Sequence, residues 1–284
     1  MAGRLIDPKN TIELIKKRDF GFKKRFGQNF LVDERVLSRI IEGAEITKAD
    51  SVLEIGPGIG TMTEALCEAA GAVKAVEIDK ELIPILSETL STYSNVEVIN
   101  ADIMDLDLKS LFLGPFKVVA NLPYYITTPI VMKLFESGAD IESVTVMVQK
   151  EVAERMQAKP GGKDYGVLSL SVSYYAEPEI IANVPPNCFI PRPEVSSAVI
   201  RLKRRSEPPV APIDRELMFE LIRAAFAQRR KKLSNSVANS GGLGFTKEQV
   251  ALALSDMGLD PMIRGEKLSL SEFSELSDRL LEMK

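Results

Sequence analysis

The segment Glu54-Ile55-Gly56-Pro57-Gly58-Ile59-Gly60 decides the fold, because it lies where an apolar strand gives way to a helix. The run SVLEIG leads into it, and TMTEALCEAA follows with helical spacing. Glycines at such a turn let the backbone approach a ligand closely, and the start of the helix presents free N–H groups. Thr61 stands where the GxGxxG fingerprint of dinucleotide sites requires its third glycine, which disfavours a nicotinamide cofactor.

Strands and helices alternate on both sides of this turn. We expect strands over 51–56, 72–78, 96–100, 116–121, 143–149, 167–177 and 195–204. Strands separated by helices predict a parallel sheet covered on both faces, and the last two strands lack such a helix, so one of them is expected to run antiparallel. The sequence thus predicts an α/β, Rossmann-like domain with a mostly parallel seven-stranded sheet. Two helices precede it, one beginning near Pro8 and one after Asp33 as N-cap.

A change of composition at Ser206 predicts a second domain. The stretch SEPPVAPID is a proline-rich linker, and the residues after it lack strand patterning. We expect domain 1–205 to be catalytic and domain 206–284 to be a small helical bundle. Helices are predicted over 215–228, after Arg229, after Thr246 as N-cap and after Ser271 as N-cap.

The composition excludes several kinds of chemistry. The 284 residues include no histidine and no tryptophan, so Ser/His/Asp triads, His-ligated zinc and His proton shuttles are ruled out. The two cysteines, Cys67 and Cys188, are far apart, and neither a disulfide nor a metal site is expected. The sequence has no signal-peptide pattern and no apolar run approaching the ~20 residues of a membrane helix, so we expect a soluble, cytoplasmic protein.

The net charge of −4 conceals a segregation of basic residues. Segments 16–25, 201–205 and 223–232 hold 15 of the 36 Lys and Arg but one of the 40 Asp and Glu, which leaves 21 basic against 39 acidic residues elsewhere. Such blocks are often ordinary solvated faces, but three of them fit an electrostatic surface for phosphates better.

Two acidic residues at later strand ends indicate a nucleoside ligand. Glu77 closes the second predicted strand, 21 residues after Gly56, where a carboxylate accepts hydrogen bonds from ribose hydroxyls. Asp102 follows the third strand and is a candidate acceptor for an adenine amino group. Ile78 and Ile103 follow the two acidic residues directly and are candidate apolar contacts for the ring, although either is as readily explained as core.

This arrangement resembles the S-adenosylmethionine (AdoMet) methyltransferase fold, and the likeness extends to the segment FGQNFL at 26–31. That segment is similar to the loop that covers the methionine end of AdoMet in rRNA adenine methylases. The resemblance makes Gln28, Asn29 and Leu31, with Gly56 and Gly58, candidate cofactor contacts.

The segment Asn121-Leu122-Pro123-Tyr124 follows the fourth predicted strand and fits the [DNS]-x-P-[YFW] pattern of enzymes that methylate exocyclic amines. The lone pair of adenine N6 is delocalised into the ring, so two acceptors gripping the N–H bonds help to aim it at the methyl group. By resemblance these acceptors are the Asn121 side-chain oxygen, which also adjoins the cofactor, and the Leu122 carbonyl. Pro123 fixes the turn, and Tyr124 is placed to stack on an extruded base.

Together with FIPRPEVSSAV at 189–199, these motifs resemble the KsgA-type small-subunit rRNA adenine dimethyltransferases across the whole chain. The resemblance implies dimethylation at N6 of two adjacent adenosines in a hairpin near the 3′ end of 16S rRNA, by a monomer acting on the immature small ribosomal subunit. It places Phe189 against the target base opposite Tyr124, although core packing is the alternative for Phe189. The residues expected to contact RNA are Lys23, Lys24, Arg25, Arg204, Arg205, Arg229, Arg230, Lys231 and Lys232.

Three alternatives stay open on the sequence. The erythromycin-resistance type shares the fold and chemistry but methylates one large-subunit adenosine, and NLPYYI with PRPEVSSAV matches it less closely. A non-enzymatic assembly factor would keep the fold only to recognise rRNA. A NAD-dependent oxidoreductase is disfavoured by Thr61 and by the NLPY segment.

Overall fold

The computed structural model describes residues 4–18 and 28–283. The chain divides into two compact units, one made of 1–153 with 177–204 and the other of 154–176 with 205–284. The C-terminal stretch of the second unit begins at Arg205, close to the predicted boundary at 206. It also takes in residues 154–176, which the sequence assigns to the first domain.

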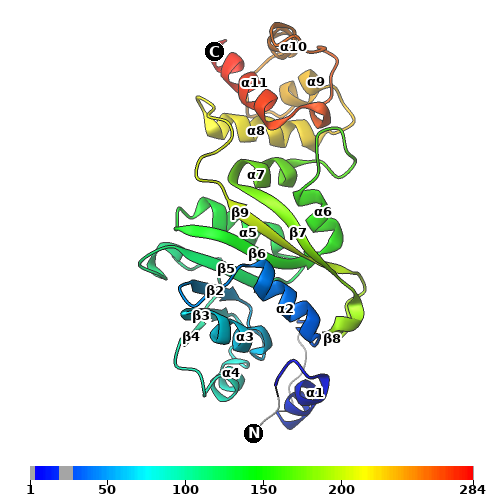
Figure 1. The fold of residues 1–284 in the computed structure, drawn as a ribbon. Helices are drawn as coiled ribbons and strands as arrows, with labels where there is room; N and C mark the ends of the chain where they lie inside the picture. The colour runs from blue at the N-terminus through cyan, green and yellow to red at the C-terminus, as the bar shows by residue number, and fades with distance from the viewer. Residues whose placement is uncertain (1–3, 19–27, 284) are drawn as a thin grey trace. The chain divides into compact units, whose positions relative to one another are not determined.

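The first unit contains the predicted seven-stranded sheet (Figure 1), in the order β4-β3-β2-β5-β6-β9-β7. Its strands are β2 (Ser51–Ile55), β3 (Ala72–Glu77), β4 (Val96–Asn100), β5 (Phe116–Asn121), β6 (Ile141–Gln149), β7 (Ala176–Val184) and β9 (Ser197–Arg204). The first five pair in parallel, and β9 runs antiparallel to β6 with Ser197 opposite Gln149. The α/β class and the mostly parallel sheet are thus confirmed.

Several helices accompany these strands in the chain, and most of them connect one strand to the next. They are α1 (Pro8–Lys17), α2 (Glu34–Gly43), α3 (Thr61–Ala69), α4 (Ile83–Thr89), α5 (Thr127–Glu136) and α6 (Lys150–Met156). The Asp33 side chain accepts from the Val36 amide, as an N-cap does, and α2 buries its apolar stripe in one hydrophobic cluster with α3 and the sheet. This packing fixes α3, whose first turn lies at the glycine segment.

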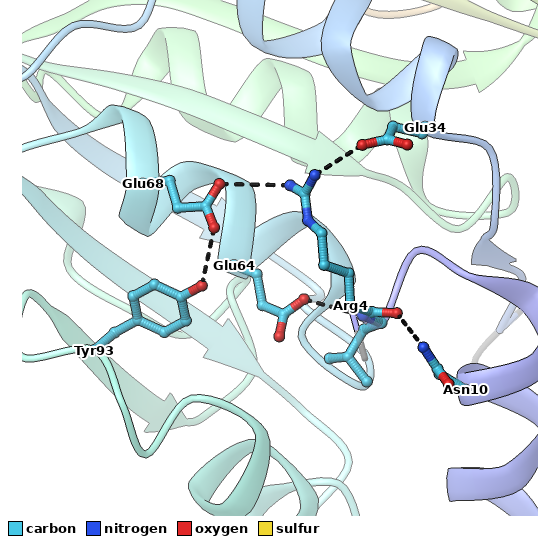
Figure 2. A network of polar contacts seen from close by, with 7 residues as sticks. Arg4, Asn10, Glu34, Glu64, Glu68 and Tyr93 are labelled. Atoms are coloured by element: carbon cyan, nitrogen blue, oxygen red, sulfur yellow. Dashed lines mark hydrogen bonds and ion pairs between the residues drawn. The ribbon is translucent and has the colours of Figure 1, made fainter. Parts of the chain in front are cut away.

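The N-terminal segment is fastened to α2 and α3 by a network of polar contacts (Figure 2). The Arg4 guanidinium donates to Glu34 at 2.7 Å and reaches Glu68 at 3.4 Å, while the Leu5 amide donates to Glu64 at 3.2 Å. Burial raises the pKa of Glu64, which lies one helical turn before Glu68. A cation between two carboxylates on one helix face offsets their repulsion, so Arg4 holds α2 and α3 together.

The second unit is helical around its own hydrophobic cluster. Its helices are α7 (Val167–Tyr175), α8 (Arg215–Ala227), α9 (Leu233–Ala238), α10 (Lys247–Asp256) and α11 (Leu270–Glu282). Thr246 caps α10 as predicted: its hydroxyl accepts from the Gln249 amide, and its own amide donates to the Gln249 side-chain oxygen. The cap of α11 is Ser269 rather than the predicted Ser271, because the Ser269 hydroxyl accepts from the Glu272 amide and the Glu272 carboxylate accepts from the Ser269 amide, which forms a capping box.

The expected strand over 167–177 is wrong, since Val167–Tyr175 forms helix α7. The alternation of apolar residues with serines suggests one exposed face, but Ser169 and Ser171 are themselves buried. The Ser169 hydroxyl donates to the Arg155 carbonyl at 2.6 Å and accepts from the Gly166 amide at 3.1 Å. Because these hydrogen bonds satisfy the Ser169 hydroxyl inside the protein, the serine does not need an exposed face, and its spacing does not indicate a strand.

The strand that takes this place in the sheet is β7, in AEPEIIANV. Its two glutamates and Pro178 obscure the strand pattern, and β7 lies at the edge of the sheet, where a proline is tolerated. A further two-stranded sheet pairs β1 (Phe30–Leu31) with β8 (Phe189–Ile190). It brings the segment predicted to cover the cofactor against the segment predicted to hold the target base.

Candidate active site

A cavity in the first unit lies at the carboxyl ends of β2, β3 and β5, where open α/β sheets bind ligands. The residues that line it are Gln28, Asn29, Phe30, Leu31, Glu54, Gly56, Pro57, Gly58, Thr61, Met62, Glu77, Ile78, Leu82, Asn121, Leu122, Pro123 and Tyr124. The structure therefore brings together the predicted cofactor loop, the glycine turn, Glu77 and the whole NLPY segment.

The glycine turn has the conformation that its sequence predicts. Gly56, Gly58 and Gly60 have φ of +71°, +62° and +97°, a region that L side chains rarely adopt. A Cβ on Gly58 would stand 2.9 Å from the Phe30 ring, so the cofactor loop closes directly on the turn. Gly60 is the N-cap of α3 and supplies no side-chain cap, which leaves the first turn of that helix to a ligand.

Glu77 at the end of β3 is held by backbone donors. Its two carboxyl oxygens accept from the Gly58 amide at 3.2 Å and from the Asp79 amide at 2.8 Å. Burial raises the pKa of Glu77, and these amides oppose the shift. Asp79, which is buried, in turn accepts from the Gln28 side chain at 3.1 Å. Gln28 is thereby joined to the glycine turn through Asp79 and Glu77.

Glu54 is a second carboxyl group on the cavity wall, and it is fully buried. Neither of its oxygens meets hydrogen-bond geometry with any residue that the structure describes. Burial raises the pKa of Glu54 to about 8, the charge of Glu77 adds to the shift, and the nearby Thr63 hydroxyl opposes it. A buried carboxyl without a partner is costly, which indicates a cationic or donating group in the bound ligand.

Asp102 and Ile103 do not line the cavity. The Asp102 side chain accepts from the Met104 amide at 2.8 Å in the turn after β4, and Ile103 is buried. Ile78, in contrast, lies on the cavity wall and is exposed, as an apolar contact for a ring would be. Of the two predicted pairs, Glu77 with Ile78 therefore lines the cavity, and Asp102 with Ile103 does not.

Asn121, the last residue of β5, is oriented by the cofactor loop. Its amide nitrogen Nδ2 donates to the Asn29 carbonyl at 2.9 Å. The remaining polar atom of the amide, Oδ1, is therefore left as an acceptor on this cavity-lining side chain. The backbone of the next residue is fixed as well, because the Leu122 amide donates to the Met147 carbonyl of β6 at 3.1 Å.

Tyr124 lines the same cavity and is partly buried. Its hydroxyl lies 2.7 Å from the Ser197 hydroxyl at the start of β9. Burial raises the pKa of Tyr124, so the phenol stays neutral at physiological pH and its ring is a stacking surface.

Phe189 does not line the cavity to which Tyr124 belongs. Its side chain is 1% exposed and packs in the hydrophobic cluster that includes Leu31, Met147 and Val199. The backbone pairing of β8 with β1 places Phe189 opposite Leu31. This packing favours the core alternative for Phe189, and its effect on the site is to support the cofactor loop.

The predicted RNA-contacting residues fall into three groups. Lys23, Lys24 and Arg25 lie outside the described residues. Several others already bond within their own unit: Arg204 donates to the Phe135 carbonyl, Arg205 to the Ser173 carbonyl, Lys232 to the Met262 sulfur, and Arg229 to both Glu266 and the Gly162 carbonyl. Arg230 and Lys231 are exposed, and they are the residues of this set best placed for phosphates.

Sequence reasoning missed Glu54, Asp79 and Ser197. Glu54 belongs to the quoted segment, and the available signal was an acidic residue inside an apolar strand. Asp79 follows Glu77 by two residues, and Ser197 belongs to the quoted PRPEVSSAV motif. Their contacts reach across 51 and 73 residues of sequence, and spacing alone does not reveal such distances.

Comparison with known proteins matches residues 19–279 to the family model described as ribosomal RNA adenine dimethylase. The chain is 58% identical to ribosomal RNA small subunit methyltransferase A of Lachnoclostridium phytofermentans over 96% of each chain. It is 48% identical to the protein of that name from Geobacillus thermodenitrificans, over 97% of each.

Solved structures give the same fold. The 23S rRNA methyltransferase ErmE matches with a TM-score of 0.68 and 31% identity, covering 89% of this chain and 99% of its own. A dimethyladenosine transferase from Plasmodium falciparum matches with a TM-score of 0.74 and 26% identity, covering 87% and 95%. Among the described residues, the structure has no helix with the length and apolar character to cross a bilayer.

Proposed function

The chain belongs to the ribosomal RNA adenine dimethylase family, and we propose that it methylates N6 of adenosine in the RNA of the small ribosomal subunit. AdoMet is the methyl donor of this family. The full-length identity to small subunit methyltransferase A of several bacteria supports the small subunit as the source of the RNA.

The residues on the cavity wall fit AdoMet. Glu77 at the end of β3 suits the ribose hydroxyls, and the orphaned carboxyl of Glu54 suits the ammonium group of the methionine part. Gln28, tied to Asp79, closes the loop over the glycine turn. When bound, AdoMet supplies an electrophilic methyl group on its sulfonium.

Asn121 orients the target amine, and its hydrogen bond to the cofactor loop is the main observation in support of the proposed function. The hydrogen bond from Asn121 Nδ2 to the Asn29 carbonyl supports this role, because it leaves Oδ1 to accept an N6 hydrogen. The Leu122 carbonyl is the second acceptor by family resemblance. Two acceptors on the two N–H bonds favour a pyramidal nitrogen and stabilise the positive charge that develops on it.

A general base is not needed for this transfer. The leaving group is a neutral thioether, and the methylated aminium is acidic enough to lose its proton to water. The absence of histidine from the sequence is therefore compatible with the reaction.

The finer assignment follows the family. We propose that the target is two adjacent adenosines in a hairpin near the 3′ end of 16S rRNA, within the maturing small subunit in the cytoplasm, and that the protein acts as a monomer. Tyr124 stacks on the extruded base from the cavity wall. Arg230 and Lys231 of the second unit neutralise phosphates of the surrounding rRNA.

Transfer of labelled methyl groups tests the proposal. Full-length protein with tritiated AdoMet and small subunits that lack the modification should label N6 of adenosine in 16S rRNA. The second candidate is methylation of the large subunit, which the 31% identity to ErmE favours. Label found only in 23S rRNA would establish that candidate instead, and RNA binding without label would indicate an assembly factor.

A further inference from the structure

The hydroxyl of Ser197 lies at the edge of the active site and has no role in the reaction described so far. It belongs to the PRPEVSSAV motif, at the first position of β9, and Ser197 is fully buried. Within the described part of the chain, its hydroxyl has one hydrogen-bond partner, the Tyr124 hydroxyl at 2.7 Å. A buried hydroxyl paired in this way has a fixed direction.

The sheet fixes Ser197 itself. Its backbone stands opposite Gln149 in the antiparallel pairing of β9 with β6. The neighbouring Ser196 carbonyl accepts from the Lys150 amide at 3.0 Å, which holds the entry into β9. Ser197 therefore presents its hydroxyl from a rigid strand rather than from a loop.

Tyr124, in contrast, lies in the short connection between β5 and α5. The backbone before Tyr124 is bonded to the backbone and side chain that follow it: the Pro123 carbonyl accepts from the Ile126 amide and from the Thr127 hydroxyl, both at 3.2 Å. The aromatic side chain keeps two torsions, and these set the direction of its ring face. A bond at the phenol oxygen restrains both torsions, since it fixes the end of the ring farthest from the backbone.

We propose that Ser197 is a positioning residue for methyl transfer, which holds the ring of Tyr124 at the angle that stacks on the target adenine. This role rests on the proposed function. Stacking of an extruded base contributes to its retention only if the aromatic face is parallel to the base. Without the anchor, the ring samples other rotamers, and the base spends less time with N6 beside Asn121.

A double-mutant cycle tests this role. Ser197→Ala and Tyr124→Phe remove the same hydrogen bond from its two ends, and Tyr124→Phe keeps the ring. We expect each variant to lower the single-turnover rate on small subunits about three- to tenfold, as loss of one neutral hydrogen bond does. The double variant should be no slower than either single variant, because the bond is lost only once. Rate losses that multiply would overturn the proposal.

Two further measurements separate positioning from a general loss of stability. The affinity for AdoMet should be unchanged in Ser197→Ala, since Ser197 does not line the cavity. Ser143→Ala, which removes another buried hydroxyl from the same sheet, serves as the matched control and should transfer methyl groups at the wild-type rate. If Ser143→Ala slows transfer as much as Ser197→Ala, the effect belongs to the fold.

The stacking itself gives a direct readout. With 2-aminopurine in place of the target adenosine of reconstituted subunits, stacking on Tyr124 should quench its fluorescence. Quenching should be strong in the wild type, weaker in Ser197→Ala and absent in Tyr124→Ala. Full quenching in Ser197→Ala would overturn the positioning role alone, whereas a wild-type chain that transfers no methyl group would overturn the proposed function and this role together.

Discussion

The two ends of the cavity are built in different ways. At the cofactor end, Glu77 is held by the amides of Gly58 and of Asp79, so most contacts lie within one turn and one strand end. At the target end, Asn121 and Tyr124 are held by Asn29 and Ser197, which are 92 and 73 residues away in the sequence. The glycine turn and Glu77 are thus a comparatively local structure, to which the cofactor loop adds one contact across 51 residues, whereas both target-end contacts join more distant segments. Variants at one end should therefore leave the other largely intact.

The largest expected effect comes from Asn121→Ala at the target end. Loss of the acceptor for N6 should lower methyl transfer about 10²- to 10³-fold, as removal of a preorganised polar group from a reacting centre does. AdoMet affinity, measured by calorimetry, should fall by about tenfold at most, since the variant also loses one hydrogen bond to the Asn29 carbonyl of the cofactor loop. Asn95→Ala is the matched control, because Asn95 is also a partly buried amide that donates to backbone carbonyls. An equal loss of cofactor affinity in Asn121→Ala would show that the two ends are not separable.

At the cofactor end, Glu77→Gln should give the opposite pattern. Removing a charged acceptor from the ribose hydroxyls should weaken AdoMet binding about 10- to 100-fold, by the typical strength of a charge-assisted hydrogen bond. The rate at saturating AdoMet should change much less. A lower saturated rate with unchanged AdoMet affinity would place Glu77 at the wrong end of the cavity.

The basic residues of the second unit test whether RNA binding lies outside both ends. Replacing Arg230 and Lys231 by glutamine should weaken subunit binding and lower the slope of log affinity against log salt by about 2. Arg279→Gln is the control, since Arg279 pairs with Glu275 on its own helix. A slope that matches the wild type would make these residues an ordinary solvated surface.

Glu54 should make the free protein less stable as the pH rises. Its folded pKa of about 8 exceeds the unfolded value of 4.5, so the folded state binds the extra proton between these values. Stability attributable to this group is therefore complete below about pH 4.5 and declines as the pH rises towards 8. In Glu54→Gln, the free energy of unfolding measured with urea should decline less between pH 5 and 8 than in the wild type. A wild-type decline that persists in the variant would assign it to other groups.

The smallest effect is expected at the N-terminal network, which lies away from both ends. Arg4→Ala breaks contacts with Glu34 and Glu68 that are half exposed, so the free energy of unfolding should fall by about 1 kcal/mol or less. Methyl transfer below the unfolding temperature should not change. A loss of AdoMet affinity would show that α3 transmits this contact to the glycine turn.

The same contrast explains what the sequence could predict. The glycine turn, the caps at Asp33 and Thr246 and the segment at Asn121 are short-range features, and each takes the predicted place. Phe189 was assigned to the base by resemblance, yet its environment depends on the pairing of β8 with β1, which no local pattern reveals. The strand predicted over 167–177 is wrong because the alternating serines suggest the exposed face of a strand, whereas Ser169 and Ser171 are buried in helix α7.

The pairing of β1 with β8 has a consequence for the order in which the protein becomes competent. Phe30 and Leu31 form part of the cavity wall, yet their backbone partners are Ile190 and Phe189. During synthesis, the chain therefore carries the glycine turn and the NLPY segment long before this wall has its partner strand. Closing a loop of this length costs entropy, and this cost is offset only when the hydrogen bonds between β1 and β8 form. We expect a nascent chain to remain catalytically silent until β8 has left the ribosome, even though every residue of the cofactor cavity has already been synthesised.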